Sequence, residues 1–197
     1  MWNLFGKGSL SNPSWNSSLA YLEENKTFIE VELETKNSGF AAVIVRAGEV
    51  GDVENFKNRI IDALRNHNEI NVATVKFKDD ELGTTWIFVE GQDLSQNLAG
   101  IGIIIHVLES NGLYDRLIGA IFPFDWFDSL REKSIRLYWI FQSRLNRFTP
   151  FVPVGDSEDR LRDQPLETRM EKAMRKRIPT EKKISEWYPI WGIPQLD

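Results

Sequence analysis

Apolar residues recur at helical spacing in four stretches of the chain. The strongest stripe consists of Leu94, Leu98, Ile101, Ile105 and Leu108. Further isoleucines widen it, which indicates a helix buried over most of its circumference. Narrower stripes with capping residues before them predict three more helices, at residues 14–25, 52–68 and 163–178.

Alternation with a period of two predicts the strands. Ile29, Val31 and Leu33 alternate with glutamates, which is typical of an antiparallel strand with one wet face. Residues 36–39 (KNSG) suit a turn, so residues 40–45 are expected to return as the second strand of a hairpin. The same reasoning predicts strands at residues 70–77, 84–89, 117–122 and 134–142, a turn at residues 123–126, and an edge strand or arm at residues 148–154.

The order of these elements indicates the fold class. Paired strands with tight turns favour an antiparallel sheet with helices packed on it, an α+β fold, over a parallel sheet. The expected organisation is an N-terminal tail at residues 1–13, an α+β domain at residues 14–154, and a C-terminal helical arm at residues 155–197 that ends in an aromatic motif.

The composition of the chain excludes several classes of functional site. The chain has 197 residues, is 42% hydrophobic, and carries a formal charge of −5, as an ordinary globular protein does. It has no cysteine, which excludes disulfides, cysteine-ligated metals and thiol nucleophiles, and it has only two histidines. The first residues do not resemble a signal peptide, and the longest apolar run, residues 98–108, is too short to cross a bilayer as a helix. We therefore expect a soluble, cytoplasmic protein, with peripheral contact at the inner face of the membrane as an alternative.

No motif in the chain points to catalysis. Asp79, Asp80 and Glu81 lie in a turn without the spacing of a calcium loop. Gly100 and Gly102 lie inside a helix, where no phosphate loop can form. We therefore expect no enzyme activity, no cofactor, and neither a catalytic nor a metal site. The basic block at residues 175–183 is interpreted as a solvated helix end, with phosphates of nucleic acid or of an anionic membrane as the alternative. No nucleic-acid partner is expected.

Aromatic residues gather at the two ends of the chain. Residues 187–194 read WYPIWGIP, and such side chains either fold back on their own domain or dock into a partner. The N-terminal aromatics pose the same choice, with contact to a membrane surface as a third option. The candidate partner-binding residues are Trp187, Tyr188, Pro189, Trp191, Trp2 and Phe5.

This ending resembles that of the PspA-associated protein B family, PspAB. Two further places are similar to the family: residues 79–90, with their acidic turn and following strand, and residues 148–153 (FTPFVP), followed by an arm that contains residues 166–169 (LETR). The resemblance spans roughly residues 27–197. It implies a soluble accessory factor of a phage-shock-type envelope stress system, encoded near the membrane-remodelling protein PspA or the membrane protease HtpX. By analogy, the element order is also similar to the secretion-chaperone-like or YbjN-like fold.

Three functions follow as hypotheses. The first is a non-enzymatic adaptor of a membrane stress response that binds a PspA-type protein or an HtpX-type membrane protease. The second is a chaperone-like homodimer that holds extended clients on a sheet face, because Tyr138 and Ile140 are expected opposite the core face of their strand. The third is an enzyme with an unrecognised pocket.

Overall fold

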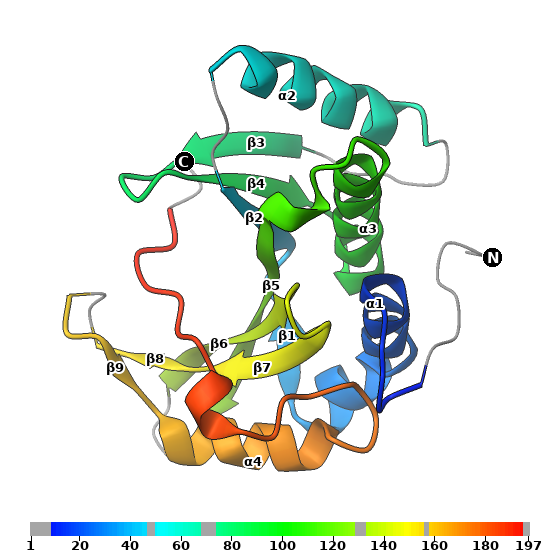
Figure 1. Ribbon diagram of the computed structural model, residues 1–197. Coiled ribbons are helices and arrows are strands. Elements are labelled where there is room, and N and C mark those ends of the chain that lie inside the picture. Colours follow the sequence, from blue (N-terminus) through cyan, green and yellow to red (C-terminus); the bar gives the residue numbers. More distant parts are fainter. Residues whose placement is uncertain (1–8, 47–49, 68–73, 129–132, 156–157, 195–197) are drawn as a thin grey trace. The chain divides into compact units, whose positions relative to one another are not determined.

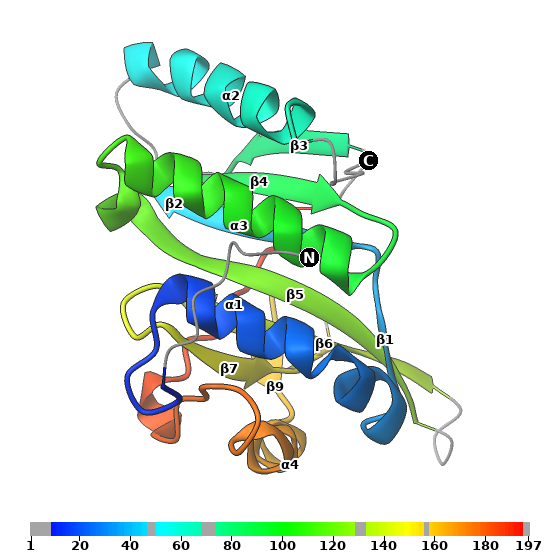
Figure 2. The ribbon, with the colours of Figure 1, turned by 90° about the vertical axis from the view of Figure 1, so that its right-hand side faces the viewer.

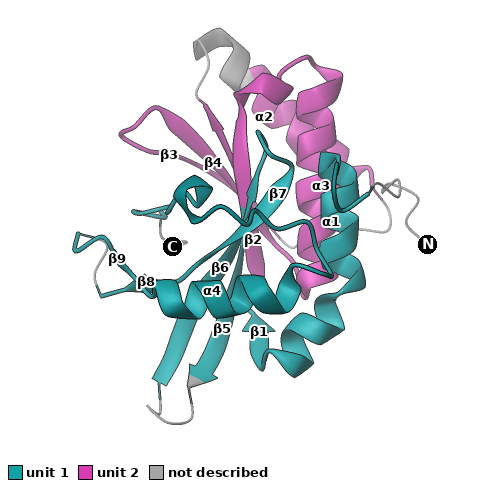
Figure 3. Cartoon of the chain, turned by 60° about the horizontal axis from the view of Figure 1, so that its bottom comes forward, with its two compact units in different colours: residues 1–38, 121–197 teal, residues 39–120 magenta. Residues whose placement is uncertain are grey.

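A computed structural model of the protein describes residues 9–46, 50–67, 74–128, 133–155 and 158–194. The chain forms two compact units (Figure 3). Unit 1 consists of residues 1–38 and 121–197, and unit 2 of residues 39–120. Both units combine antiparallel strands with helices. This confirms the predicted α+β class.

The strands of unit 2 centre on β4 (Thr84–Glu90). β2 (Phe40–Arg46) and β3 (Thr74–Asp79) both pair with β4 in antiparallel register. Residues 85–89 are buried without a break, as the uninterrupted apolar run in this strand indicates for a central position. The partner of β2 is therefore β4, whereas the sequence led us to expect a hairpin with residues 29–33.

Two helices complete unit 2 (Figure 2). α3 (Leu94–Ser110) packs on β2 and β4, and α2 (Val50–Arg65) packs on α3. The side chain of Asp93 caps α3 by accepting a hydrogen bond from the backbone N–H of Gln96 at 2.9 Å. α3 leads into the short helix η2 (Tyr114–Arg116) and then into β5 (Leu117–Asp128), which runs on into unit 1.

The strands of unit 1 follow one another as antiparallel neighbours. β1 (Thr35–Asn37) pairs with β5, β5 neighbours β6 (Lys133–Gln142), and β6 pairs with β7 (Arg147–Phe151). α1 (Trp15–Glu24) contacts β7 and begins with a capping box between Ser14 and Ser17.

The elements that follow β7 pack back on this unit (Figure 1). The short strands β8 (Pro153–Val154) and β9 (Leu161–Arg162) pair, α4 (Gln164–Met174) lies against β7, and η3 (Ile184–Glu186) follows. Between α4 and η3, the chain bonds to β7: Phe148 N–H donates to the Pro179 carbonyl at 2.8 Å, and Glu181 N–H donates to the Phe148 carbonyl at 3.0 Å. The arm therefore extends the ladder beyond β7.

The predicted strand at residues 29–33 is wrong. Residues 28–32 form a single turn of π-helix, η1 (Phe28–Glu32), which follows α1 along the chain. Ile29 is fully buried, but Val31 is 65% exposed, so the alternating residues do not share a buried face. Thr35 Oγ1 donates to the carbonyl of Ile29 at 2.7 Å and so fastens the turn to β1.

The predicted turn at residues 123–126 is also wrong. β5 continues through Pro123 to Asp128, because Phe124, Asp125 and Trp126 pair with β1. The Pro123 carbonyl accepts hydrogen bonds from Ser38 N–H at 3.1 Å and Asn37 Nδ2 at 3.3 Å. Pairing with β1 thus keeps residues 123–126 extended, although their sequence is typical of a turn.

Candidate partner-binding surface

Trp187 is anchored inside its own unit. Its side chain is 4% exposed, and its indole Nε1 donates a hydrogen bond to the Glu181 carbonyl at 2.7 Å. Its own carbonyl accepts from Arg162 Nη1 at 3.1 Å. Trp187 therefore holds residues 183–194, called the terminal segment below, against unit 1.

Trp191 makes a second contact. Its ring meets Phe151 edge to face, with centroids 4.9 Å apart and an angle of 86° between the planes. Phe151 stacks in turn on Tyr138, at 6.0 Å. Tyr138 is 9% exposed and Ile140 only 3%. The expected client-holding face on β6 is therefore wrong, because the side chains that were to form it are buried.

Glu186 fastens the start of the terminal segment. Its carbonyl accepts from Gln142 Nε2 at 2.9 Å, and its carboxylate pairs with Arg144 at 2.6 Å and Lys183 at 3.2 Å. Hydrogen bonds from Arg144 and then Lys183 hold the pKa of Glu186 below its usual value.

The anchoring residues were not found by sequence reasoning. Arg162 Nε donates to both carboxylate oxygens of Glu167, at 2.8 and 2.9 Å. The backbone N–H of Val152 donates to the same carboxylate at 2.8 Å. Burial raises the pKa of Glu167, and the bonds from Arg162 and Val152 act in the opposite direction. An ion pair between Arg162 of β9 and the buried Glu167 of α4 thus positions the carbonyl of Trp187. No local pattern signals this, because Arg162 and Trp187 are far apart in sequence.

Other residues of the terminal segment face solvent. Tyr188 is 56% exposed, and Pro189 is exposed beside it. The candidate set from the sequence therefore divides into the anchors Trp187 and Trp191 and the exposed pair Tyr188 and Pro189. Trp2 and Phe5 lie outside the described residues.

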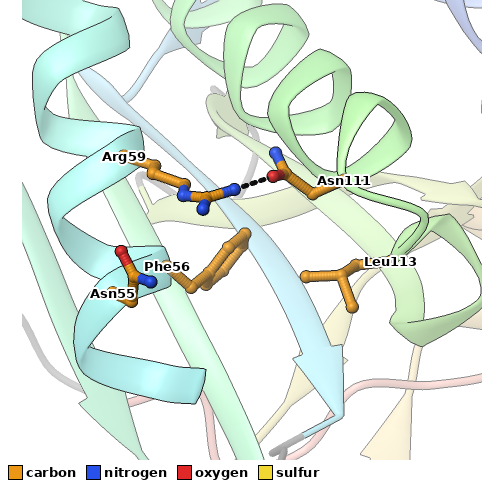
Figure 4. A pocket seen from close by; sticks show the side chains of 5 residues that line it. All are labelled: Asn55, Phe56, Arg59, Asn111 and Leu113. Atoms are coloured by element: carbon orange, nitrogen blue, oxygen red, sulfur yellow. Dashed lines mark hydrogen bonds between the residues drawn. The ribbon is translucent and has the colours of Figure 1, made fainter. Parts of the chain in front are cut away.

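Unit 2 contains a small pocket of about 220 Å³ (Figure 4). Its described lining consists of Asn55, Phe56, Arg59, Asn111 and Leu113, from α2 and the residues after α3. Arg59 donates to the side-chain oxygen of Asn111, whose amide donates to the Val107 carbonyl at 2.7 Å. The lining offers amides and one guanidinium around an apolar wall, which suits hydrogen bonding to a small polar group.

The acidic turn at residues 79–81 is occupied by internal hydrogen bonds. Asp80 accepts from the backbone N–H groups of Leu82 and Thr84 and from Trp86 Nε1, each at 2.9 Å. Burial alone would raise the pKa of Asp80, but these bonds outweigh it and lower that pKa. Within the described ranges, no group of three or more histidine, aspartate or glutamate side chains is placed to hold a metal ion.

No helix in the described part of the chain is both long and apolar enough to cross a membrane. A comparison with curated proteins gave no significant match, and a comparison with solved structures gave none either. The secretion-chaperone-like analogy therefore stays a prediction. A family model described as PspA associated protein B matches residues 2–195, nearly the whole chain. The chain belongs to the PspAB family.

Proposed function

We propose that this protein is a non-enzymatic accessory factor of an envelope stress response that binds a PspA-type protein through Tyr188 and Pro189. The description of the family supports association with PspA. The observation that carries the choice of surface is the 56% exposure of Tyr188, directly beside the buried Trp187.

The anchors prepare this surface for binding. Trp187 on one side and Trp191 on the other are held by unit 1, so the backbone of Tyr188 and Pro189 is already restrained. A restrained loop loses little conformational entropy when a partner docks. Tyrosine is also among the residue types that contribute most at protein interfaces.

The non-enzymatic part of the proposal rests on the sequence, in which no motif points to catalysis.

The test is a calorimetric titration of the full chain with the PspA-type protein of the same organism. Tyr188→Ala is expected to weaken binding by about thirtyfold, the loss of one interface hot spot of ~2 kcal/mol. The matched control is Phe127→Ala, another exposed aromatic of unit 1, at 60% exposure. The control should change the affinity less than about twofold. Equal affinities for the wild type and Tyr188→Ala would refute the proposed surface, and no binding by the wild type would refute the partner.

An HtpX-type membrane protease is the alternative partner for the same surface. The titration is therefore repeated with the detergent-solubilised protease. If the protease binds in a manner that depends on Tyr188 and the PspA-type protein does not bind, the protease is the partner of this accessory factor. Light scattering of the chain alone tests the homodimer that the chaperone-like alternative requires.

A further inference from the structure

Unit 1 has an open groove of about 500 Å³ beside the first residue of β7. The groove is called the basic groove below. Its walls come from three parts of the chain: the residues before α1, the start of β7, and the end of α4 with the residues that follow it. The lining residues are Leu10, Ser11, Arg147, Arg175, Pro179, Thr180, Glu181 and Lys182.

Arg147 is held in this groove by backbone carbonyls. Its guanidinium donates to the carbonyls of Leu10 and Thr180, each at 3.3 Å, and to the carbonyl of Ser11 at 2.7 Å. These acceptors are neutral, so they fix the guanidinium in place without cancelling its charge. A guanidinium has five N–H donors, and two of those of Arg147 have no acceptor within the part of the chain that the structure describes.

Two more cations line the groove. Lys182 is exposed and forms no ion pair with any residue that the structure describes. Arg175 pairs with the buried Glu171, and its own Nε is buried without a hydrogen-bond acceptor in the described part of the chain. Glu181 is the carboxylate among the lining residues. Counting Glu171 as well, three cations face two carboxylates, so the groove is positive although the whole chain carries −5.

The arrangement of donors favours a tetrahedral anion. Arg147, Arg175 and Lys182 line the groove from β7, from the end of α4 and from the segment after it. A phosphate group presents oxygens in several directions and can meet donors on three walls, whereas a planar carboxylate presents two oxygens in one plane. Guanidinium groups also match phosphate oxygens in a bidentate geometry. The volume leaves room for the group to which a phosphate is attached.

We propose that the basic groove binds a phosphate group, carried either by a phospholipid headgroup or by a small soluble molecule. In this proposal, the basic block at residues 175–183 contributes to a binding site and is not only a solvated helix end. The fold adds Arg147 to it, and the parallel bridge between Phe148 and Thr180 fixes the distance between the two parts. This proposal is independent of the partner-binding role of Tyr188.

The test uses the full chain at an ionic strength of about 0.15 M, where nonspecific attraction is screened beyond about 8 Å. One arm titrates the protein with inorganic phosphate in a calorimeter. The other measures co-sedimentation with phosphatidylcholine vesicles that contain or lack phosphatidic acid. Binding to phosphatidic acid without binding to soluble phosphate identifies a headgroup site, and binding to soluble phosphate identifies a small-molecule site.

Lys182→Glu is expected to weaken phosphate binding by about tenfold, because it removes one exposed cation and adds an anion. The matched control is Lys172→Glu, an exposed lysine of α4 that is not among the groove residues, with an expected change of less than about threefold. Circular dichroism verifies that both variants are folded. Absence of binding in both arms, an unchanged affinity in Lys182→Glu, or an equal loss in the two variants would each overturn the proposal.

Discussion

Replacing Trp187 with alanine is expected to lower the free energy of unfolding of unit 1 by about 4 kcal/mol. A tryptophan side chain buries ~200 Å² when docked, and at ~25 cal/mol per Å² this gives an upper bound of about 5 kcal/mol. Buried tryptophans replaced by alanine typically cost about 3–5 kcal/mol. The exposed fraction of 4% places Trp187 in that class, and the substitution also removes the donor to the Glu181 carbonyl.

The assay is urea denaturation followed by far-UV circular dichroism, which does not depend on the fluorescence of the residue that is removed. Trp187→Phe keeps most of the ring but loses the Nε1 bond, so it should cost about 1–2 kcal/mol. Tyr188→Ala, at 56% exposure, is the adjacent control and should change stability by less than about 0.5 kcal/mol. A loss below about 1 kcal/mol in Trp187→Ala would show that the terminal segment is not packed on unit 1.

Two further predictions test the local structure. Ile29→Ala should destabilise the protein by about 3 kcal/mol and Val31→Ala by less than about 0.5 kcal/mol, because Ile29 is fully buried and Val31 is 65% exposed. Equal losses of stability in denaturation curves would instead support a strand at residues 29–33. Asp80 has a lowered pKa in the folded state, so its stabilising contribution is complete above about pH 4, the usual pKa of aspartate, and is lost as the pH falls through the folded-state value. Asp80→Asn should therefore lose less stability than the wild type as the pH is lowered from roughly 5 to 2, the range in which a carboxylate with a lowered pKa becomes protonated. Acid-unfolding curves of the two proteins measure this difference. Parallel curves would contradict the assignment of Trp86 Nε1 and the backbone N–H of Thr84 as donors to an ionised Asp80.

The long periodic elements could be predicted because their signals are local and repeated. The stripe of α3 lies in a helix of 17 residues with a capping aspartate before it, and β6 has apolar residues at every second position from Ile135 to Phe141. The prediction of a strand at residues 29–33 failed because a pattern of only five residues fits a strand and a helical turn about equally well. There the burial of one side chain, Ile29, and its bond to Thr35 decide the conformation.

The sequence by itself determined the α+β class, the main helices and strands, the family resemblance, and the presence of an aromatic ending. These depend on neighbouring residues, periodicity and composition. Only the tertiary structure decided that Trp187 is an anchor while Tyr188 stays exposed, since Arg162, Gln142 and Glu167 hold the segment from other elements. It alone brought Arg147 to the basic block, across a separation of 28 or more residues. Such contacts are fixed by strand register and helix packing, which no short stretch of sequence encodes.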